Sequence, residues 1–172
     1  MRLREVEELL SNGRAVEAVA LCRRLAQAAP RDAATQHVMS NALLSSGQPA
    51  QALHYAQVAA ALAPGDVGLM LQHANLLLIA GKAEKALDVL ARAAKVAPDA
   101  ASVHSMRASA LLDLNRCVAA LEASREACRC APGDAGAVAQ FASCLLNAGR
   151  AEEAVEAMLP LVREEEIGRA HV

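Results

Sequence analysis

The chain has 172 residues, of which 55% are hydrophobic and 21% are charged, and its formal net charge is −2. This length corresponds to one ordinary domain, and a nearly balanced charge without a basic run argues against nucleic-acid binding. One Tyr, one Phe and no Trp are present. A β-sandwich core is therefore not expected, because strands favour aromatic and β-branched residues.

The sequence also indicates the compartment. No apolar stretch approaches the roughly 18 residues that a membrane-spanning helix needs, so we expect no membrane insertion. The N-terminal residues Arg2, Arg4 and Glu5 are charged where a secretory signal would be apolar. The five cysteines are an odd number and are scattered along the chain, which does not suggest a disulfide framework. We therefore predict a cytoplasmic protein.

The same residue types recur every 34 residues along most of the chain. Proline marks one column, and a second column contains glycine or, once, asparagine. Alanine occupies a third column, and paired leucines occupy two more. These columns are Pro30, Pro64, Pro98 and Pro132; Gly13, Gly47, Gly81, Asn115 and Gly149; Ala18, Ala52, Ala86, Ala120 and Ala154; and Leu9-Leu10, Leu43-Leu44, Leu77-Leu78, Leu111-Leu112 and Leu145-Leu146. A fixed period of this length is the signature of a repeat architecture.

Each period contains two runs of helix-forming residues, the first closed by Gly or Asn and the second by Pro. Gly and Asn accept the left-handed conformation that ends a helix, while Pro lacks the donor that would continue one. We predict first helices near 2–12, 33–46, 67–80, 101–114 and 135–148, and second helices near 15–28, 49–62, 83–96, 117–130 and 151–163. Asp32, Asp66 and Asp134 precede three of the first helices, where a carboxylate can accept from free amides of the first turn.

The last residues carry no repeat signal. Pro160 lies inside the last predicted helix and should kink or end it, because proline removes a backbone hydrogen bond there. We expect residues 164–172 to form a disordered tail or to be an artefact. Residues 166–172 resemble the translation of a common sequencing adapter, in which case the natural protein would continue differently from this point.

The period and its proline and small-residue columns resemble the tetratricopeptide repeat family over residues 1–163. The resemblance implies an all-α fold, a right-handed α-solenoid of five helix-turn-helix repeats. The repeats would span about 1–32, 33–66, 67–100, 101–134 and 135–163. Positions where the family often has aromatic residues carry Gln36, Met70, His104 and Val138 instead. Each pair of helices must bury its apolar face against its neighbours.

No catalytic, metal or cofactor site is suggested by the residue pattern. Cys22, Cys128 and Cys130 fall on predicted second helices, whereas His37 and His104 fall on first helices of other repeats. A cysteine nucleophile needs a base within hydrogen-bond reach. We therefore predict that this chain is not an enzyme and needs no cofactor, and that the cysteines are ordinary small packing residues.

In the family, first helices line a concave groove that binds extended peptides. The resemblance places polar side chains at groove-facing positions: His37, Asn41, Gln72, Asn75, Ser105, Ser109, Gln140 and Ser143. Beyond Arg4 these columns lack the basic residues with which some family members hold a terminal carboxylate. Asn and Gln side chains can both donate to and accept from a peptide bond. For Asn41 and Asn75, a simple solvated surface role remains an equal alternative.

Three functions stay open at this point. The first is a non-catalytic interaction module that binds an extended peptide or partner protein in its groove. The second is the N-terminal arm of a larger bacterial enzyme, such as a glycosyltransferase or sulfotransferase. The third is a scaffold that self-associates through an exposed apolar C-terminal face.

Overall fold

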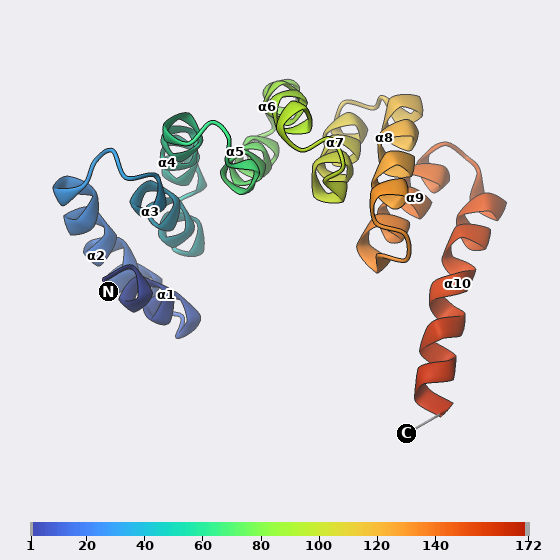
Figure 1. Cartoon of the computed structure of the whole chain (residues 1–172), viewed down its shortest axis with the longest axis horizontal. Coiled ribbons are helices and arrows are strands. Elements are labelled where there is room, and N and C mark those ends of the chain that lie inside the picture. Colours follow the sequence, from blue (N-terminus) through green and yellow to red (C-terminus); the bar gives the residue numbers. More distant parts are fainter. Residues whose placement is uncertain (1, 171–172) are drawn as a thin grey trace. The chain divides into compact units, whose positions relative to one another are not determined.

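The computed structural model describes residues 2–170, with side chains described for residues 3–160. This part of the chain forms ten helices and no strand (Figure 1). The helices are α1 (Arg2–Ser11), α2 (Ala15–Ala28), α3 (Ala33–Ser45), α4 (Pro49–Leu62), α5 (Val67–Ile79), α6 (Ala83–Val96), α7 (Ala101–Asp113), α8 (Cys117–Cys130), α9 (Ala135–Asn147) and α10 (Ala151–Ala170). The all-α fold of helix-turn-helix repeats is confirmed, and nine helices end within one residue of the predicted bounds.

The chain divides into two compact units, Met1–Lys85 and Ala86–Val172. In the first unit each helix from α1 to α5 packs against the next, and α1 also contacts α3. In the second unit the same holds from α7 to α10, and α7 also contacts α9. First helices of successive repeats therefore lie side by side within each unit, as a stacked repeat requires.

The turn between paired helices is closed by the glycine column together with the paired leucines. Gly47 has a φ of 76°, a left-handed conformation that costs glycine little. Its N–H donates to the carbonyl of Leu44 at 3.0 Å, and the next N–H, of Gln48, donates to Leu43 at 2.9 Å. This is the Schellman motif. The other repeats close their first helices in the same way, at Gly13, Gly81, Asn115 and Gly149.

Aspartates begin three of the first helices, as predicted. The Asp32 carboxylate accepts from the N–H of Thr35 at 3.0 Å, and Asp66 accepts from Leu69 at 3.1 Å. In the last repeat the Asp134 carboxylate accepts from the N–H of Ala137 at 2.7 Å. Each bond satisfies an amide that has no partner inside its own helix. The residue before α7 is Ala100, which offers no side-chain cap.

The cap at Asp32 should make stability depend on pH. Hydrogen bonds from the side chain and backbone of Thr35 hold the pKa of Asp32 below its ordinary value of 3.8. A lowered folded-state pKa adds stability above the unfolded value, and this stability is lost as the pH falls through the folded value. We expect Asp32→Ala to lower the free energy of unfolding by about 0.5–2 kcal/mol near neutral pH.

Urea denaturation at neutral pH and well below 3.8 measures this effect. The difference between Asp32→Ala and the unmodified chain should shrink at the acidic pH, because the carboxylate is then protonated in both folded and unfolded chains. An equal loss at both pH values would show that Asp32 acts through packing instead of through its charge.

Small residues fill the closest contacts between helices. The alanine column is fully buried at Ala18, Ala52, Ala86 and Ala120, and Ala154 is 3% exposed. Larger side chains complete the core of the first unit, among them Met39, Leu43 and Leu76. In the second unit the core contains Leu111, Leu121, Cys144 and Leu145. Because alanine adds only a methyl group, the paired helices can approach closely.

Two of the residues that replace the family's aromatics form partly buried hydrogen bonds. Gln36 Nε2 donates to the carbonyl of Pro30 at 2.9 Å, and His104 Nε2 lies 2.7 Å from the carbonyl of Pro98. Both side chains are buried. Each bond ties a first helix to the proline that closes the preceding second helix. A polar link therefore occupies part of the space that a large ring would fill.

The last helix differs from the prediction, since α10 continues to Ala170 although Pro160 lies inside it. The expected end near residue 163 was therefore too early. A proline removes one backbone hydrogen bond, whereas the residues on both sides of it, such as Glu156 and Glu164, favour the helix. Of the predicted tail, residues 171–172 lie outside the described residues.

Candidate binding site

Three of the predicted groove residues meet between α3 and α5. His37 and Asn41 lie four residues apart on α3 and therefore on one face of the helix. Asn41 Nδ2 is 3.2 Å from His37 Nε2, and Asn41 Oδ1 accepts from Gln72 Nε2 on α5. Gln72 Nε2 also lies 3.5 Å from the hydroxyl of Ser40. We call His37, Asn41 and Gln72 the amide cluster.

Each hydrogen bond of the amide cluster has a defined donor and a defined acceptor. Asn41 Nδ2 can only donate, so this contact requires the His37 tautomer in which Nε2 accepts and Nδ1 carries the proton. His37 Nδ1 and Gln72 Oε1 are buried, and neither has a hydrogen-bond partner among the described residues. The cluster thus ends in an unused donor at His37 and an unused acceptor at Gln72. A buried polar atom without a partner costs about 1–3 kcal/mol.

The remaining groove candidates do not join this cluster. Asn75 is exposed on α5, three residues beyond Gln72. In the second unit, Ser105 and Ser109 are half-buried, and the Ser109 hydroxyl donates to the carbonyl of Ser105 at 3.3 Å. The described hydrogen bond at the exposed Ser143 joins its carbonyl to Asn147 on the same helix, and Gln140 is half-buried. The amide cluster therefore contains three of the eight predicted residues, all in the first unit.

A pocket of about 470 Å³ adjoins the amide cluster at His37. It lies between the first turns of α3 and α5 and the turn that precedes α5. Its lining residues are Ala33, Ala34, His37, Ala63, Asp66, Gly68 and Leu69. We call it the His37 pocket. Apart from His37, these residues were not predicted as site residues, because the two helix starts meet only through tertiary packing.

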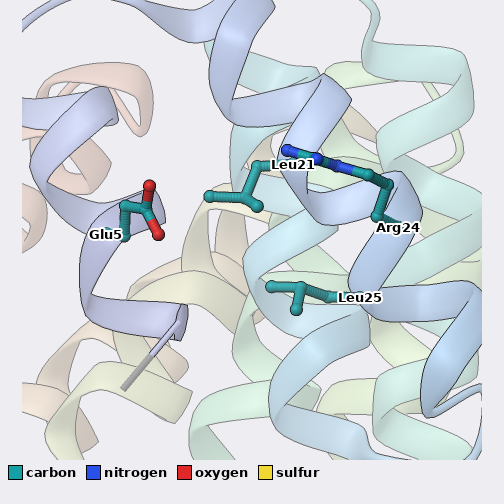
Figure 2. Close-up of a pocket in the computed structure, with 4 residues that line it drawn as sticks. All are labelled: Glu5, Leu21, Arg24 and Leu25. Atoms are coloured by element: carbon teal, nitrogen blue, oxygen red, sulfur yellow. The ribbon is translucent and has the colours of Figure 1, made fainter.

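Two more pockets lie in the first unit. One, of about 270 Å³, is lined by Glu5, Leu21, Arg24 and Leu25. Figure 2 shows Glu5 extending from α1, and Leu21, Arg24 and Leu25 extending from α2 on the other side. The other pocket, of about 390 Å³, is lined by Arg23, Ala26, Gln27, Pro30, Gln36 and Tyr55. Both contain an arginine, in contrast to the His37 pocket.

The thiols of Cys22 and Cys128 lie in surroundings typical of packing residues. Burial raises the pKa of the Cys22 thiol to about 11 and also raises the pKa of Cys128. A thiol with a raised pKa stays protonated near neutral pH and is a poor nucleophile. Among the residues that the structure describes, no three His, Cys, Asp or Glu side chains gather as metal ligands. No described helix is both long and apolar enough to cross a bilayer.

Charged side chains on the second helices pair with near neighbours at the surface. Arg129 Nε lies 2.8 Å from the Glu126 carboxylate, and both side chains are exposed. Arg14 pairs with Glu17 and Arg150 with Glu153 at the same three-residue spacing. The arginine hydrogen bond lowers the pKa of Glu126 from its ordinary value. Exposed pairs of this kind contribute little to stability.

Comparison with known proteins agrees with the repeat pattern. The tetratricopeptide repeat family model matches residues 43–110. MamA from Desulfovibrio magneticus RS-1 is 18% identical with a TM-score of 0.82, over 95% of this chain and 92% of that one. TTC0263, a TPR protein from Thermus thermophilus, is 22% identical with a TM-score of 0.74, over 94% and 89% of the two chains.

A third solved structure, YrrB, is 16% identical with a TM-score of 0.71, over 91% of this chain and 81% of that one. No curated protein sequence matches the chain. At these identities the solved structures establish the fold, and the family match adds the repeat type. The tetratricopeptide repeat family model therefore matches the central part of this chain, and the solved structures share its fold.

Proposed function

We propose that this chain is a non-catalytic binding module whose amide cluster holds the main chain of an extended polypeptide. The supporting observation is the pair of unused polar atoms, His37 Nδ1 and Gln72 Oε1. A peptide unit carries one N–H donor and one C=O acceptor. It is therefore the chemical complement of a cluster that ends in one donor and one acceptor. Contacts to the main chain give affinity without strong sequence selectivity.

Binding would require small side-chain movements. Both unused atoms are covered in the free chain, whereas His37 and Gln72 as whole residues are only half-buried. Rotation of these side chains toward the bound peptide would expose the unused atoms and satisfy them. The free energy lost by leaving them unpaired is recovered at that step, which favours the bound state.

The fold and the cysteines are consistent with this role. YrrB is described as a TPR protein with an unusual peptide-binding site, so a related fold is associated with peptide binding outside the usual mode. The free cysteines in the structure favour a reducing compartment such as the cytoplasm.

A random peptide library displayed on phage tests the proposal. We expect peptides selected on the purified chain to bind the double variant Asn41→Ala/Gln72→Ala about tenfold more weakly, because the Gln72 acceptor is lost and Asn41 no longer holds the His37 ring in place. Isothermal titration calorimetry gives the dissociation constants. Methylation of single backbone nitrogens in a selected peptide should also weaken binding.

The double variant Gln51→Ala/Gln57→Ala is the matched control. It removes two amides that are exposed on the second helix α4, and it should bind as the unmodified chain does. Equal affinity of the two double variants, at unchanged melting temperature, would remove the amide cluster from the site. Light scattering at two concentrations during the same experiments tests self-association as the competing function.

A further inference from the structure

The His37 pocket continues the amide cluster toward the starts of α3 and α5. Ala33, His37 and Asn41 follow one another at four-residue spacing on α3, and Gly68 and Gln72 do so on α5. Residues four apart lie on one helix face. A polypeptide held by the amide cluster would therefore have the His37 pocket next to it, within reach of one of its side chains.

The lining of the His37 pocket is apolar with one negative charge. Ala33, Ala34, Ala63 and Leu69 supply hydrocarbon surface, and Asp66 is the one charged lining residue. The Asp66 carboxylate accepts from the N–H of Leu69 at 3.1 Å, and the described ion pairs do not include it. The pocket thus has an anionic rim that no described cation neutralises.

Gly68 keeps that carboxylate uncovered. A Cβ atom at position 68 would lie 3.2 Å from Asp66 Oδ1, which is tighter than ordinary contact. Glycine is, after proline, the least favourable residue inside a helix, yet it occupies the second residue of α5. Its lack of a side chain leaves both the pocket and the Asp66 oxygen open.

We propose that the His37 pocket receives a lysine or arginine side chain of the bound polypeptide, an assignment that rests on the proposed function. Long basic side chains bury their hydrocarbon stems on apolar surface and keep the charged end in water. Here the stem would lie on Ala33, Ala63 and Leu69, and the charged end would reach Asp66. A glutamate at the same peptide position would face the carboxylate and be repelled.

The peptides selected on the phage library test this assignment. We expect a lysine or arginine at one position of the selected peptides. Changing it to leucine should weaken binding roughly two- to fivefold, the effect of one partly exposed ion pair, and changing it to glutamate should weaken it further. The difference between the lysine and leucine peptides should shrink at high salt, because salt screens the pair.

The variant Asp66→Asn removes the charge and keeps the helix cap, since asparagine caps a helix as well as aspartate does. It should bind the lysine peptide as weakly as the unmodified chain binds the leucine peptide, with its own affinity for the leucine peptide unchanged. Asp134→Asn, at the equivalent cap in the second unit, is the matched control and should have no effect.

Failure of the proposed function and failure of the pocket assignment give different binding results. Peptides that bind Asn41→Ala/Gln72→Ala as tightly as the unmodified chain would contradict the proposed function itself. Peptides that need the amide cluster, yet bind equally well with lysine or leucine and are insensitive to Asp66→Asn, would overturn only the assignment of the His37 pocket.

Discussion

Replacing Leu43 with alanine is expected to lower the free energy of unfolding by about 2–5 kcal/mol. Leu43 is fully buried in the core of the first unit, near Met39 and Leu76. The shorter side chain loses apolar burial and leaves a cavity that the packed helices cannot fill completely. Urea denaturation followed by circular dichroism measures the change.

The control for this experiment is Val16→Ala. Val16 is 78% exposed on α2, so shortening its side chain should change stability by less than about 0.5 kcal/mol. A loss below about 1 kcal/mol for Leu43→Ala would contradict the placement of the paired-leucine column in the core.

The second large effect is expected from adding volume at the alanine column. Ala52 is fully buried on α4, and its carbonyl accepts a hydrogen bond from the Ser40 hydroxyl of α3 at 2.9 Å. Ala52→Leu would push α3 and α4 apart and strain that bond. Overpacking of this kind costs about 1–3 kcal/mol, which the same denaturation experiment can resolve.

Ala61→Leu provides the comparison on the same helix. Ala61 is exposed on α4, and alanine and leucine have nearly the same helix propensity. The substitution should therefore leave stability almost unchanged. If Ala52→Leu were equally harmless, the alanine column would not set the distance between paired helices, and the repeat period would need another explanation.

These core positions also bear on binding. The amide cluster depends on a hydrogen bond between Asn41 of α3 and Gln72 of α5. On α3 the buried residues Ser40 and Ala42 flank Asn41. Any substitution that shifts α3 against its neighbours should therefore weaken peptide binding as well as stability, so the binding variants must be compared at unchanged melting temperature.

The sequence by itself determined the helices and their ends. The caps at Asp32 and Asp66 and the turn at Gly47 use contacts between residues three to five positions apart. Such contacts can be predicted from residues that are close together in the sequence, and the 34-residue period repeats them along the chain. The end of α10 was the exception, because the helix continues past Pro160 to Ala170.

The amide cluster follows partly from the sequence and partly from the tertiary structure. The repeat register placed His37, Asn41, Gln72 and Asn75 on first helices, and the described hydrogen bonds join the first three but not Asn75. Asn41 and Gln72 are 31 residues apart, and the His37 pocket joins two helix starts. Their meeting depends on how closely α3 and α5 pack, which is set by the volumes of buried side chains and not by any local pattern.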